Sequence, residues 1–351
     1  LAAGARPAGA GEFTRRAFLN GKLDLTRAEA VMELIAADGR LSARTALAAR
    51  EGNLYRRMET VKNELVGLSA HFSAYVDYPD EDIPALDEAA LDGVLARAEE
   101  SLSSLLATYD AGRVLREGVD TVIVGSPNVG KSTLMNWLAG CERSIVTPVA
   151  GTTRDVVEET VRLGDVVLRL SDTAGIRETG DQIERMGVER SLAAAQEADL
   201  ALFVVDGSKP FSAEDQEAMD AALGARACIA LMNKTDLGQV IEASDLPFDY
   251  VVPISAKNGM GMELLEQAMD MLFADDAPCD GSLLTNARQA EAIVRARDSL
   301  RLAQRSMQAG LTPDAVLVDV EAAMLALGEV TGRTMREDIT NRIFERFCVG
   351  K

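Results

Sequence analysis

The sequence predicts an α/β domain with a mainly parallel six-stranded sheet, inserted into an all-α helical domain. Between residues 119 and 275, short apolar runs alternate with helical patterns, which is typical of a mainly parallel sheet covered by helices. A two-residue turn at Gly164-Asp165 joins two of these runs, so we expect one antiparallel strand. Helical periodicity fills residues 20–116 and resumes at residue 286, which predicts a helical flank on each side.

The first helical flank contains the capping-box pattern Thr26-x-x-Glu29, which we expect to open a helix ending near Gly39. A long amphipathic stretch follows and continues to about Tyr75. The segment 78–84 contains two prolines and breaks the helical pattern, because proline cannot continue a helix. A further helix is predicted over residues 86–109.

The apolar runs of the α/β domain define its strands, and the last part of the chain is again helical. The predicted strands are 121–125, 156–162, 166–171, 200–205, 227–232 and 250–254. From residue 286 the helical pattern continues to the end, with interruptions around residues 310–313 and at Thr331-Gly332. Glycine and proline at these places are typical helix stops.

The composition excludes several classes of protein. The 351 residues contain 47% apolar side chains but no apolar run long enough to span a membrane. Four scattered cysteines do not form a disulfide framework and indicate a reducing cytoplasm, while a single histidine, His71, argues against histidine-based triads and metal sites. A net charge of −20 is unfavourable for broad, non-specific nucleic-acid binding. The chain starts at Leu1, so we expect the natural N-terminus to be missing.

A phosphate-binding loop is predicted where the first strand ends. Residues 125–132 read Gly-Ser-Pro-Asn-Val-Gly-Lys-Ser, directly after an apolar strand and directly before a helix. The glycines let backbone N–H groups and the helix N-terminus face phosphate oxygens. Lys131 can reach the β- and γ-phosphates, and the Ser132 hydroxyl is placed to bind Mg²⁺. The residues predicted to bind a nucleoside triphosphate here are Asn128, Val129, Gly130, Lys131, Ser132 and Thr133.

Three further motifs follow in order, each after a predicted strand, and together they indicate GTP. Asp172 can hold Mg²⁺ through water, and the Gly175 amide can sense the γ-phosphate. Asp236 can accept the guanine N1–H and 2-amino hydrogens, a donor pair that adenine lacks. The predicted contacts of these motifs are Asp172, Gly175, Asn233, Lys234, Asp236, Ser255, Ala256 and Lys257, the last three supplying a backbone amide to guanine O6. This order predicts a P-loop GTPase domain.

The residue after the Asp-Thr-Ala-Gly motif indicates an unusual hydrolytic mechanism. Switch GTPases carry a Gln there that orients the attacking water, whereas Ile176 cannot form a hydrogen bond to water. Asn128 offers a side-chain carbonyl oxygen beside the phosphates, where a monovalent cation can replace an arginine finger. Thr153 lies in a switch-like segment and is the predicted second Mg²⁺ ligand beside Ser132.

Two features of the sequence allow alternative interpretations. The charge-rich segment 177–190 is either a solvated helix or the source of a carboxylate that reaches the attacking water. Cys348 lies close to Lys351, which can lower the pKa of its thiol and make it reactive, but it can also be a small apolar residue that docks the tail.

With these residues in view, the chain resembles the tRNA modification GTPase MnmE (TrmE) family over essentially its whole length. Four stretches outside the shared GTPase motifs carry the resemblance, and they are residues 11–25, 77–81, 176–185 and the terminal Phe-Cys-Val-Gly-Lys of 347–351. The resemblance implies that most of the N-terminal domain of this family lies outside this sequence. That domain dimerises the protein and binds 5-formyl-tetrahydrofolate, the one-carbon donor.

The resemblance implies an activity and roles for further residues. The family works with MnmG, an FAD-binding partner, to install an aminomethyl-type group at C5 of the wobble uridine of certain tRNAs. It implies K⁺-dependent GTP hydrolysis with G domains that dimerise face to face, and the implied K⁺ ligands are Asn128, Thr147, Val149 and Thr152. Glu184 matches the glutamate that orients water, and Arg154 and Arg177 match arginines needed for turnover. Cys348 matches a cysteine implicated in the modification reaction.

The resemblance also implies a domain organisation and a set of partners. Residues 1–20 are expected to be the remnant of the N-terminal domain, 21–116 and 276–351 the two halves of the helical domain, and 117–275 the GTPase domain. The implied cofactors are GTP, Mg²⁺ and K⁺, with the folate bound by the full-length protein. The implied partners are the flavoprotein, tRNA and a second copy of the chain, in the cytoplasm and without a membrane.

Two other functions fit parts of the sequence. A ribosome-assembly GTPase of the Era or Der type shares the phosphate loop and the apolar residue after Asp-Thr-Ala-Gly. It would carry a KH-like RNA-binding domain after the GTPase domain, whereas residues 286–351 are predicted to be helical. A non-enzymatic scaffold that uses GTP only as a conformational switch is the third possibility.

Overall fold

The computed structural model describes residues 4, 6–37, 39–77, 88–140, 159–170, 194–273, 281–345 and 347. It divides into two compact units, which we call the helical unit and the α/β unit. The helical unit comprises Leu1–Ala37, Ser42–Arg116 and Pro278–Lys351, and the α/β unit comprises Asp38–Leu41 and Glu117–Ala277. Along the chain, the α/β unit therefore interrupts the helical unit, as predicted. Among the described helices, none combines the length and apolar character that a membrane span requires.

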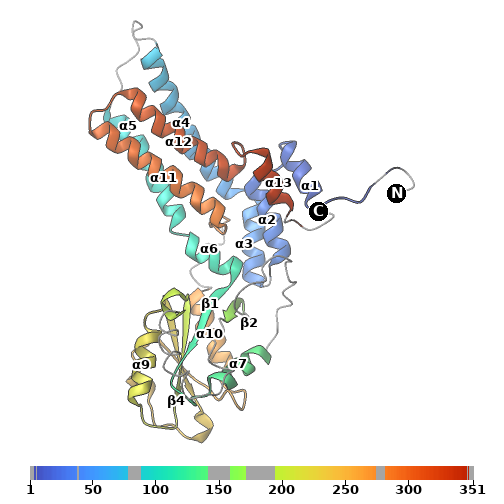
Figure 1. Ribbon diagram of the computed structural model, residues 1–351, viewed down its shortest axis with the longest axis vertical. Coiled ribbons are helices and arrows are strands. Elements are labelled where there is room, and N and C mark those ends of the chain that lie inside the picture. The colour runs from blue at the N-terminus through green and yellow to red at the C-terminus, as the bar shows by residue number, and fades with distance from the viewer. Residues whose placement is uncertain are drawn as a thin grey trace. The chain divides into compact units, whose positions relative to one another are not determined.

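The helical unit is built around long helices that pack along one another (Figure 1). Its helices are α1 (Glu12–Leu19), α2 (Leu25–Ala36), α3 (Arg40–Arg50, which starts within the α/β unit), α4 (Asn53–Asp77), α5 (Glu88–Leu106), α6 (Tyr109–Glu117), α11 (Ala287–Gln308), α12 (Pro313–Thr331) and α13 (Glu337–Glu345). Helix α11 packs on α5 and α12, and α12 packs on α4. Leu65, Leu95 and Leu300 are fully buried in the core that these helices share. The two sequence-distant halves thus form one apolar core.

The predicted capping box at Thr26 and Glu29 is wrong. Helix α2 begins at Leu25, and its N-cap is Asp24, whose carboxylate accepts a hydrogen bond from the Arg27 backbone N–H at 3.0 Å. An aspartate two residues earlier caps the helix instead, because its carboxylate accepts a hydrogen bond from one of the free N–H groups of the helix start. Glu29 is therefore released from capping, and it is buried and pairs with residues of α11 instead.

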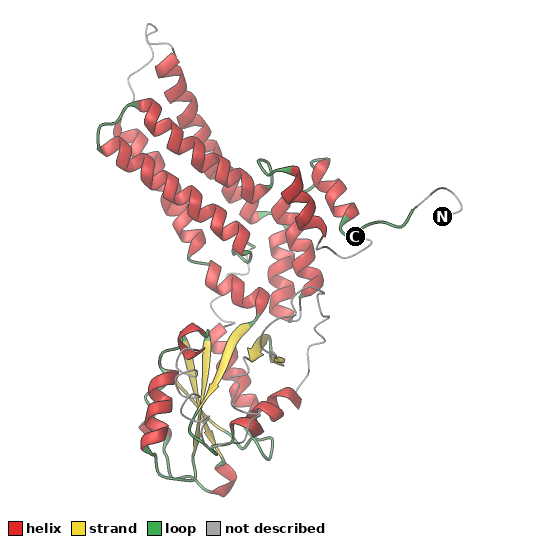
Figure 2. Cartoon of the chain, in the orientation of Figure 1, coloured by secondary structure: helices red, strands yellow, loops and turns green. Residues whose placement is uncertain are grey.

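The α/β unit contains a sheet whose strands are drawn in yellow in Figure 2. The sheet has six strands in the order β2-β3-β1-β4-β5-β6. Its strands are β1 (Val119–Val124), β2 (Glu159–Leu163), β3 (Val166–Leu170), β4 (Leu200–Asp206), β5 (Ala227–Asn233) and β6 (Tyr250–Pro253). Strands β2 and β3 pair antiparallel, and the other pairings among the described strands are parallel. The predicted sheet with one antiparallel strand is confirmed.

The connections of the sheet include the helices α7 (Lys131–Gly140), α9 (Ala213–Ala222) and α10 (Met262–Phe273), and the short helices η1 (Thr235–Leu237) and η2 (Ala243–Asp245). Apolar residues of β1, β4 and β5, such as Phe203, pack with α9 in one core.

The parallel pairing brings the predicted motifs to one edge of the sheet. Asp206, the last residue of β4, is the register partner of Asn233, the last residue of β5. The phosphate loop follows β1, and Ser255 follows β6. In open α/β sheets, ligands bind at the carboxyl ends of the strands, so this edge is the place for the site.

Candidate nucleotide-binding site

The phosphate loop requires glycine at both of its predicted glycine positions. A Cβ atom at Gly125 would overlap the Val204 carbonyl oxygen, so β4 leaves no room for a side chain there. Gly130 has a φ of 106°, and a Cβ there would overlap the Asn233 side-chain nitrogen. Asn128, at the tip of the loop, has a φ of 61°, a left-handed conformation that asparagine tolerates better than most residues.

Lys131 begins α7 and folds its side chain back over the loop. Its Nζ donates to the carbonyl oxygens of Gly125 at 2.6 Å and Ser126 at 2.8 Å. Ser132 and Thr133 follow in the first turn of α7 and are exposed. A helix N-terminus with an ammonium group beside it attracts anions, so this end of α7 is suited to phosphate.

Asn233 connects the phosphate loop to the loop after β6. Its side chain is buried, donates to the Val129 carbonyl oxygen at 2.9 Å and accepts from the Ala256 backbone N–H at 3.1 Å. Because both ends of the amide are used, Asn233 acts as a brace between loops that are far apart in sequence.

Asp236 and Ser255 form the part of the site predicted to read the base. The Ser255 hydroxyl, which is fully buried, donates to Asp236 Oδ1 at 2.6 Å. Asp236 itself is exposed, as is Lys257. The hydrogen bond orients the carboxylate while solvent can still reach it, which suits a group that must accept hydrogen bonds from a ligand.

Lys234 spans from the base-reading motif to the phosphate loop. Its Nζ donates to the Asn128 carbonyl oxygen at 2.7 Å and to Asp206 Oδ2 at 2.7 Å. Burial raises the pKa of the Asp206 carboxyl, but hydrogen bonds from Lys234 and Ser208 outweigh burial and lower that pKa below its usual value. Asp206 is therefore ionised at neutral pH and pairs with the lysine.

Three further residues at this site have no role in the sequence-based prediction. They are Asp206, Ser126 and Asp215, and all are buried. The Ser126 hydroxyl donates to Asp215 Oδ1 at 2.5 Å, and Asp215 also closes a capping box with Ser212 at the start of α9. The capping-box spacing of Ser212 and Asp215 was visible in the sequence, but the contact with the phosphate loop was not.

Comparison with known protein families decides the identity of this site. A family model described as the MnmE helical domain matches residues 25–348. The chain belongs to the MnmE family. The tRNA modification GTPase MnmE of Heliobacterium modesticaldum is 45% identical over 100% of this chain and 78% of that protein. The MnmE of Alkaliphilus metalliredigens is 43% identical over 100% of this chain and 77% of that protein.

Among solved structures, the Era protein of Aquifex aeolicus bound to GDP and AlF₄⁻ is 28% identical at a TM-score of 0.33, covering 52% of this chain and 67% of that one. Membership of the MnmE family confirms the predicted resemblance and the predicted enzyme class, a GTPase. The described residues after the α/β unit form α11, α12 and α13. These described residues are helical, as the resemblance to the MnmE family predicts, whereas the alternative of a ribosome-assembly GTPase predicts a KH-like domain there.

Several predicted site residues lie outside the described residues. They are Thr147, Val149, Thr152, Thr153, Arg154, Asp172, Gly175, Arg177, Glu184 and Cys348. The predicted site residues that the structure does describe lie in the phosphate loop and in the motifs around Asn233 and Ser255, and hydrogen bonds join these segments. Within the described ranges, no cluster of three or more His, Cys, Asp or Glu side chains has the arrangement of a metal site.

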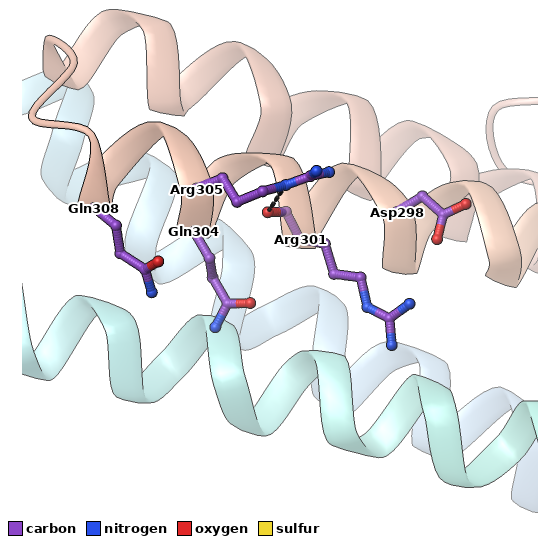
Figure 3. Close-up of a pocket in the computed structure, with 5 residues that line it drawn as sticks. All are labelled: Asp298, Arg301, Gln304, Arg305 and Gln308. Carbon is purple, nitrogen blue, oxygen red and sulfur yellow. Dashed lines mark hydrogen bonds between the residues drawn. The ribbon is translucent and has the colours of Figure 1, made fainter.

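A cavity of about 540 Å³ lies elsewhere, on the helical unit (Figure 3). Its lining residues all belong to α11, and they are Asp298, Arg301, Gln304, Arg305 and Gln308. Arg301 is paired with Glu99 of α5 at 2.6 Å, Asp298 is paired with Arg297 at 2.9 Å, and the cavity is open to solvent. No residue of the predicted MnmE nucleotide site contributes to it.

Cys228 in β5 should be inert to thiol reagents. Burial raises the pKa of its thiol from 9.0 to about 12. At about pH 8, roughly one thiol in 10,000 is then ionised, and only the thiolate is reactive. Mass spectrometry after iodoacetamide treatment should find Cys228 unmodified in the native protein and modified in guanidinium chloride. The Cys228 thiol ionises more readily in the unfolded chain, where its pKa is 9.0, than in the folded protein, where its pKa is about 12. The stability that the buried thiol contributes is therefore fully present below pH 9.0 and declines as the pH rises toward 12. Rapid native labelling would contradict this burial.

Proposed function

We propose that this chain is a K⁺-dependent GTP hydrolase that acts with an FAD-binding partner to modify C5 of the wobble uridine of certain tRNAs. The observation that supports the proposal most directly is the conformation of Asn128. Its backbone is left-handed at φ 61°, its carbonyl oxygen is held by Lys234 at 2.7 Å, and its side chain is exposed. The side-chain amide oxygen of Asn128 is therefore accessible at the tip of the phosphate loop.

The phosphate loop supplies the groups that bind the triphosphate. Backbone N–H groups of the loop and of the N-terminus of α7 donate hydrogen bonds to the phosphate oxygens, and Lys131 Nζ, which lies over the loop, adds a positive charge. At the other side of the site, Asp236 accepts the hydrogens of guanine while Ser255 holds its carboxylate. The phosphate loop can bind any nucleoside triphosphate, and the Asp236 carboxylate selects GTP over ATP.

The residues present fit the two cations that the mechanism calls for. The exposed Ser132 hydroxyl in the first turn of α7 is an oxygen donor suited to Mg²⁺, with Thr153 as its proposed second ligand. The exposed amide oxygen of Asn128 suits K⁺, with Thr147, Val149 and Thr152 as further proposed ligands. When bound, such a cation neutralises charge that develops between the β- and γ-phosphates.

The remaining catalytic roles are proposed on the family resemblance. Glu184 orients the attacking water through a second water, because Ile176 cannot do so. Arg154 and Arg177 support turnover, and Cys348 takes part in the modification of the uridine. The proposed domain limits are 21–116 and 276–351 for the helical domain and 117–275 for the GTPase domain, after a remnant in 1–20.

The proposed partners follow from the same family. They are an MnmG-type flavoprotein, tRNA and a second copy of this chain, held constitutively through the N-terminal domain that also binds 5-formyl-tetrahydrofolate and transiently through the G domains. The relatives that the chain matches are tRNA modification GTPases by name. We place the reaction in the cytoplasm, where tRNA is modified.

The dependence on the cation tests the proposal. GTP hydrolysis should be at least about tenfold faster in KCl than in NaCl, since stabilising the transition state by about 1.4 kcal/mol changes the rate tenfold. Asn128→Ala should remove this difference, whereas Asn136→Ala, an exposed asparagine on α7, should keep it. Equal rates in the two salts would contradict the proposal. Addition of the flavoprotein should leave the KCl preference in place.

A further inference from the structure

The site holds a buried carboxylate that none of the predicted motifs includes. Asp206 ends β4 and is 7% exposed. Its Oδ1 accepts hydrogen bonds from the Ser208 hydroxyl at 2.6 Å and the Ser208 backbone N–H at 3.2 Å. Its Oδ2 accepts from Lys234 Nζ at 2.7 Å, and Lys209 Nζ lies 3.7 Å from the same oxygen. Both carboxylate oxygens are thus occupied in a geometry that leaves little freedom.

Lys234 is held between this carboxylate and the phosphate loop. Its Nζ is 2.7 Å from Asp206 Oδ2 and 2.7 Å from the Asn128 carbonyl oxygen. A lysine side chain loses much rotamer freedom when it is fixed, and a single neutral carbonyl compensates for that loss poorly. The charge-assisted hydrogen bond from Lys234 to Asp206 is stronger than the bond to the Asn128 carbonyl oxygen. It therefore fixes the ammonium group within hydrogen-bond distance of that carbonyl oxygen.

The carbonyl that Lys234 reaches belongs to the residue of the loop with the least favourable backbone. Asn128 has a φ of 61°, and such a conformation persists only when its surroundings hold it. The peptide group of Asn128 is anchored by Lys234 on one side, and the next residue, Val129, is anchored by Asn233 at 2.9 Å. Asp206 therefore lies at the base of a chain of contacts that ends in the phosphate loop.

We propose that Asp206 is a positioning residue that fixes the phosphate loop through Lys234 and thereby slows the release of nucleotide. Its effect on the cation site at Asn128 rests on the proposed function, whereas its effect on nucleotide binding does not.

The first test compares Asp206→Asn with Asp199→Asn in the full chain. Asp199 lies just before the opposite end of β4, is 5% exposed and accepts a backbone hydrogen bond from Asp120 at 3.1 Å, so it controls for loss of a buried carboxylate. Release of a fluorescent GDP, measured by stopped flow, should be about tenfold faster in Asp206→Asn and nearly unchanged in Asp199→Asn. Unchanged release in a folded Asp206→Asn variant, or equal effects of the two, would overturn the proposal.

The second test asks whether Asp206 acts through Lys234. In a Lys234→Met background, Asp206→Asn should produce no further acceleration of GDP release, because the bridge is already absent. If the two substitutions together accelerate GDP release by the product of their separate effects, Asp206 acts independently of Lys234, and the proposal is overturned. If Asp206→Asn fails to fold, Ser208→Ala replaces it, because this change removes a hydrogen bond from Oδ1. About twofold faster release is then expected, and no change would count against the proposal.

The cation dependence separates this inference from the proposed function. In a parent protein that is activated by KCl, Asp206→Asn should raise the KCl concentration for half-maximal hydrolysis by about threefold or more, and Asp199→Asn should not. An unchanged KCl requirement would confine Asp206 to nucleotide binding and overturn its role at Asn128. If the parent protein hydrolyses GTP equally fast in KCl and NaCl, the proposed K⁺ dependence is wrong. The GDP release experiment still tests the role of Asp206 in that case.

Discussion

Asp236→Asn should lower the affinity for GDP by about 100-fold or more. The carboxylate is exposed, and Ser255 orients it through a hydrogen bond of 2.6 Å. It can accept the guanine N1–H and one 2-amino hydrogen, and each hydrogen bond to a charged group contributes about 1.5–3 kcal/mol. The amide of asparagine keeps one acceptor but turns a donor toward the 2-amino group. Two donors then face each other, and the base is no longer recognised.

A change of base restores binding to this variant. Xanthine keeps the N1–H donor but carries a carbonyl oxygen in place of the 2-amino group, so it complements an amide. Asp236→Asn should therefore bind a xanthosine diphosphate better than GDP, whereas the parent should prefer GDP. Isothermal titration calorimetry with both nucleotides measures this reversal, and the exposed Asp249→Asn in the same unit provides the control. Weak binding of both nucleotides would show that Asp236 supports the loop rather than reading the base.

Arg288→Met should destabilise the helical unit by about 3–5 kcal/mol, the usual cost of removing one partner from a buried ion pair. The Arg288 guanidinium donates to Glu29 at 3.0 Å and 2.7 Å, and the two side chains are 23% and 8% exposed. Glu29 also accepts from Gln289 at 2.7 Å and from Asn286 at 3.2 Å. Without the arginine, a buried carboxylate keeps only neutral donors.

Another ion pair of α11 provides the matched control. Arg295 pairs with Glu329 at 2.5 Å, but the side chains are 56% and 36% exposed. Water screens such a pair, so Arg295→Met should cost only about 0–1 kcal/mol. Because the chain has two units, the unfolding of the helical unit should be followed by hydrogen exchange in α11 as denaturant is added. Equal losses for the two variants would mean that burial of the Glu29 pair does not determine its strength.

The sheet could be predicted because its information is local. Each strand is a short apolar run, and the turn at Gly164-Asp165 forces the one antiparallel pairing. The helix start near residue 25 was predicted from the wrong cap, since Asp24 and Thr26 both fit capping chemistry and only the packing of Glu29 against α11 separates them. Local patterns of this kind identify an element but leave its neighbours undefined.

The motif residues could be identified from order and spacing, because phosphate and guanine demand particular groups after particular strands. The chain by itself thus determined the fold class, the ligand and the family resemblance. Only the tertiary structure decided how those groups are held, as when Lys234 meets a carbonyl 106 residues away and Ser126 meets Asp215 89 residues away. Such bonds form because parallel strands bring their carboxyl ends to one edge, a register that no local pattern encodes. Asp206 acquires its place in the site in this way.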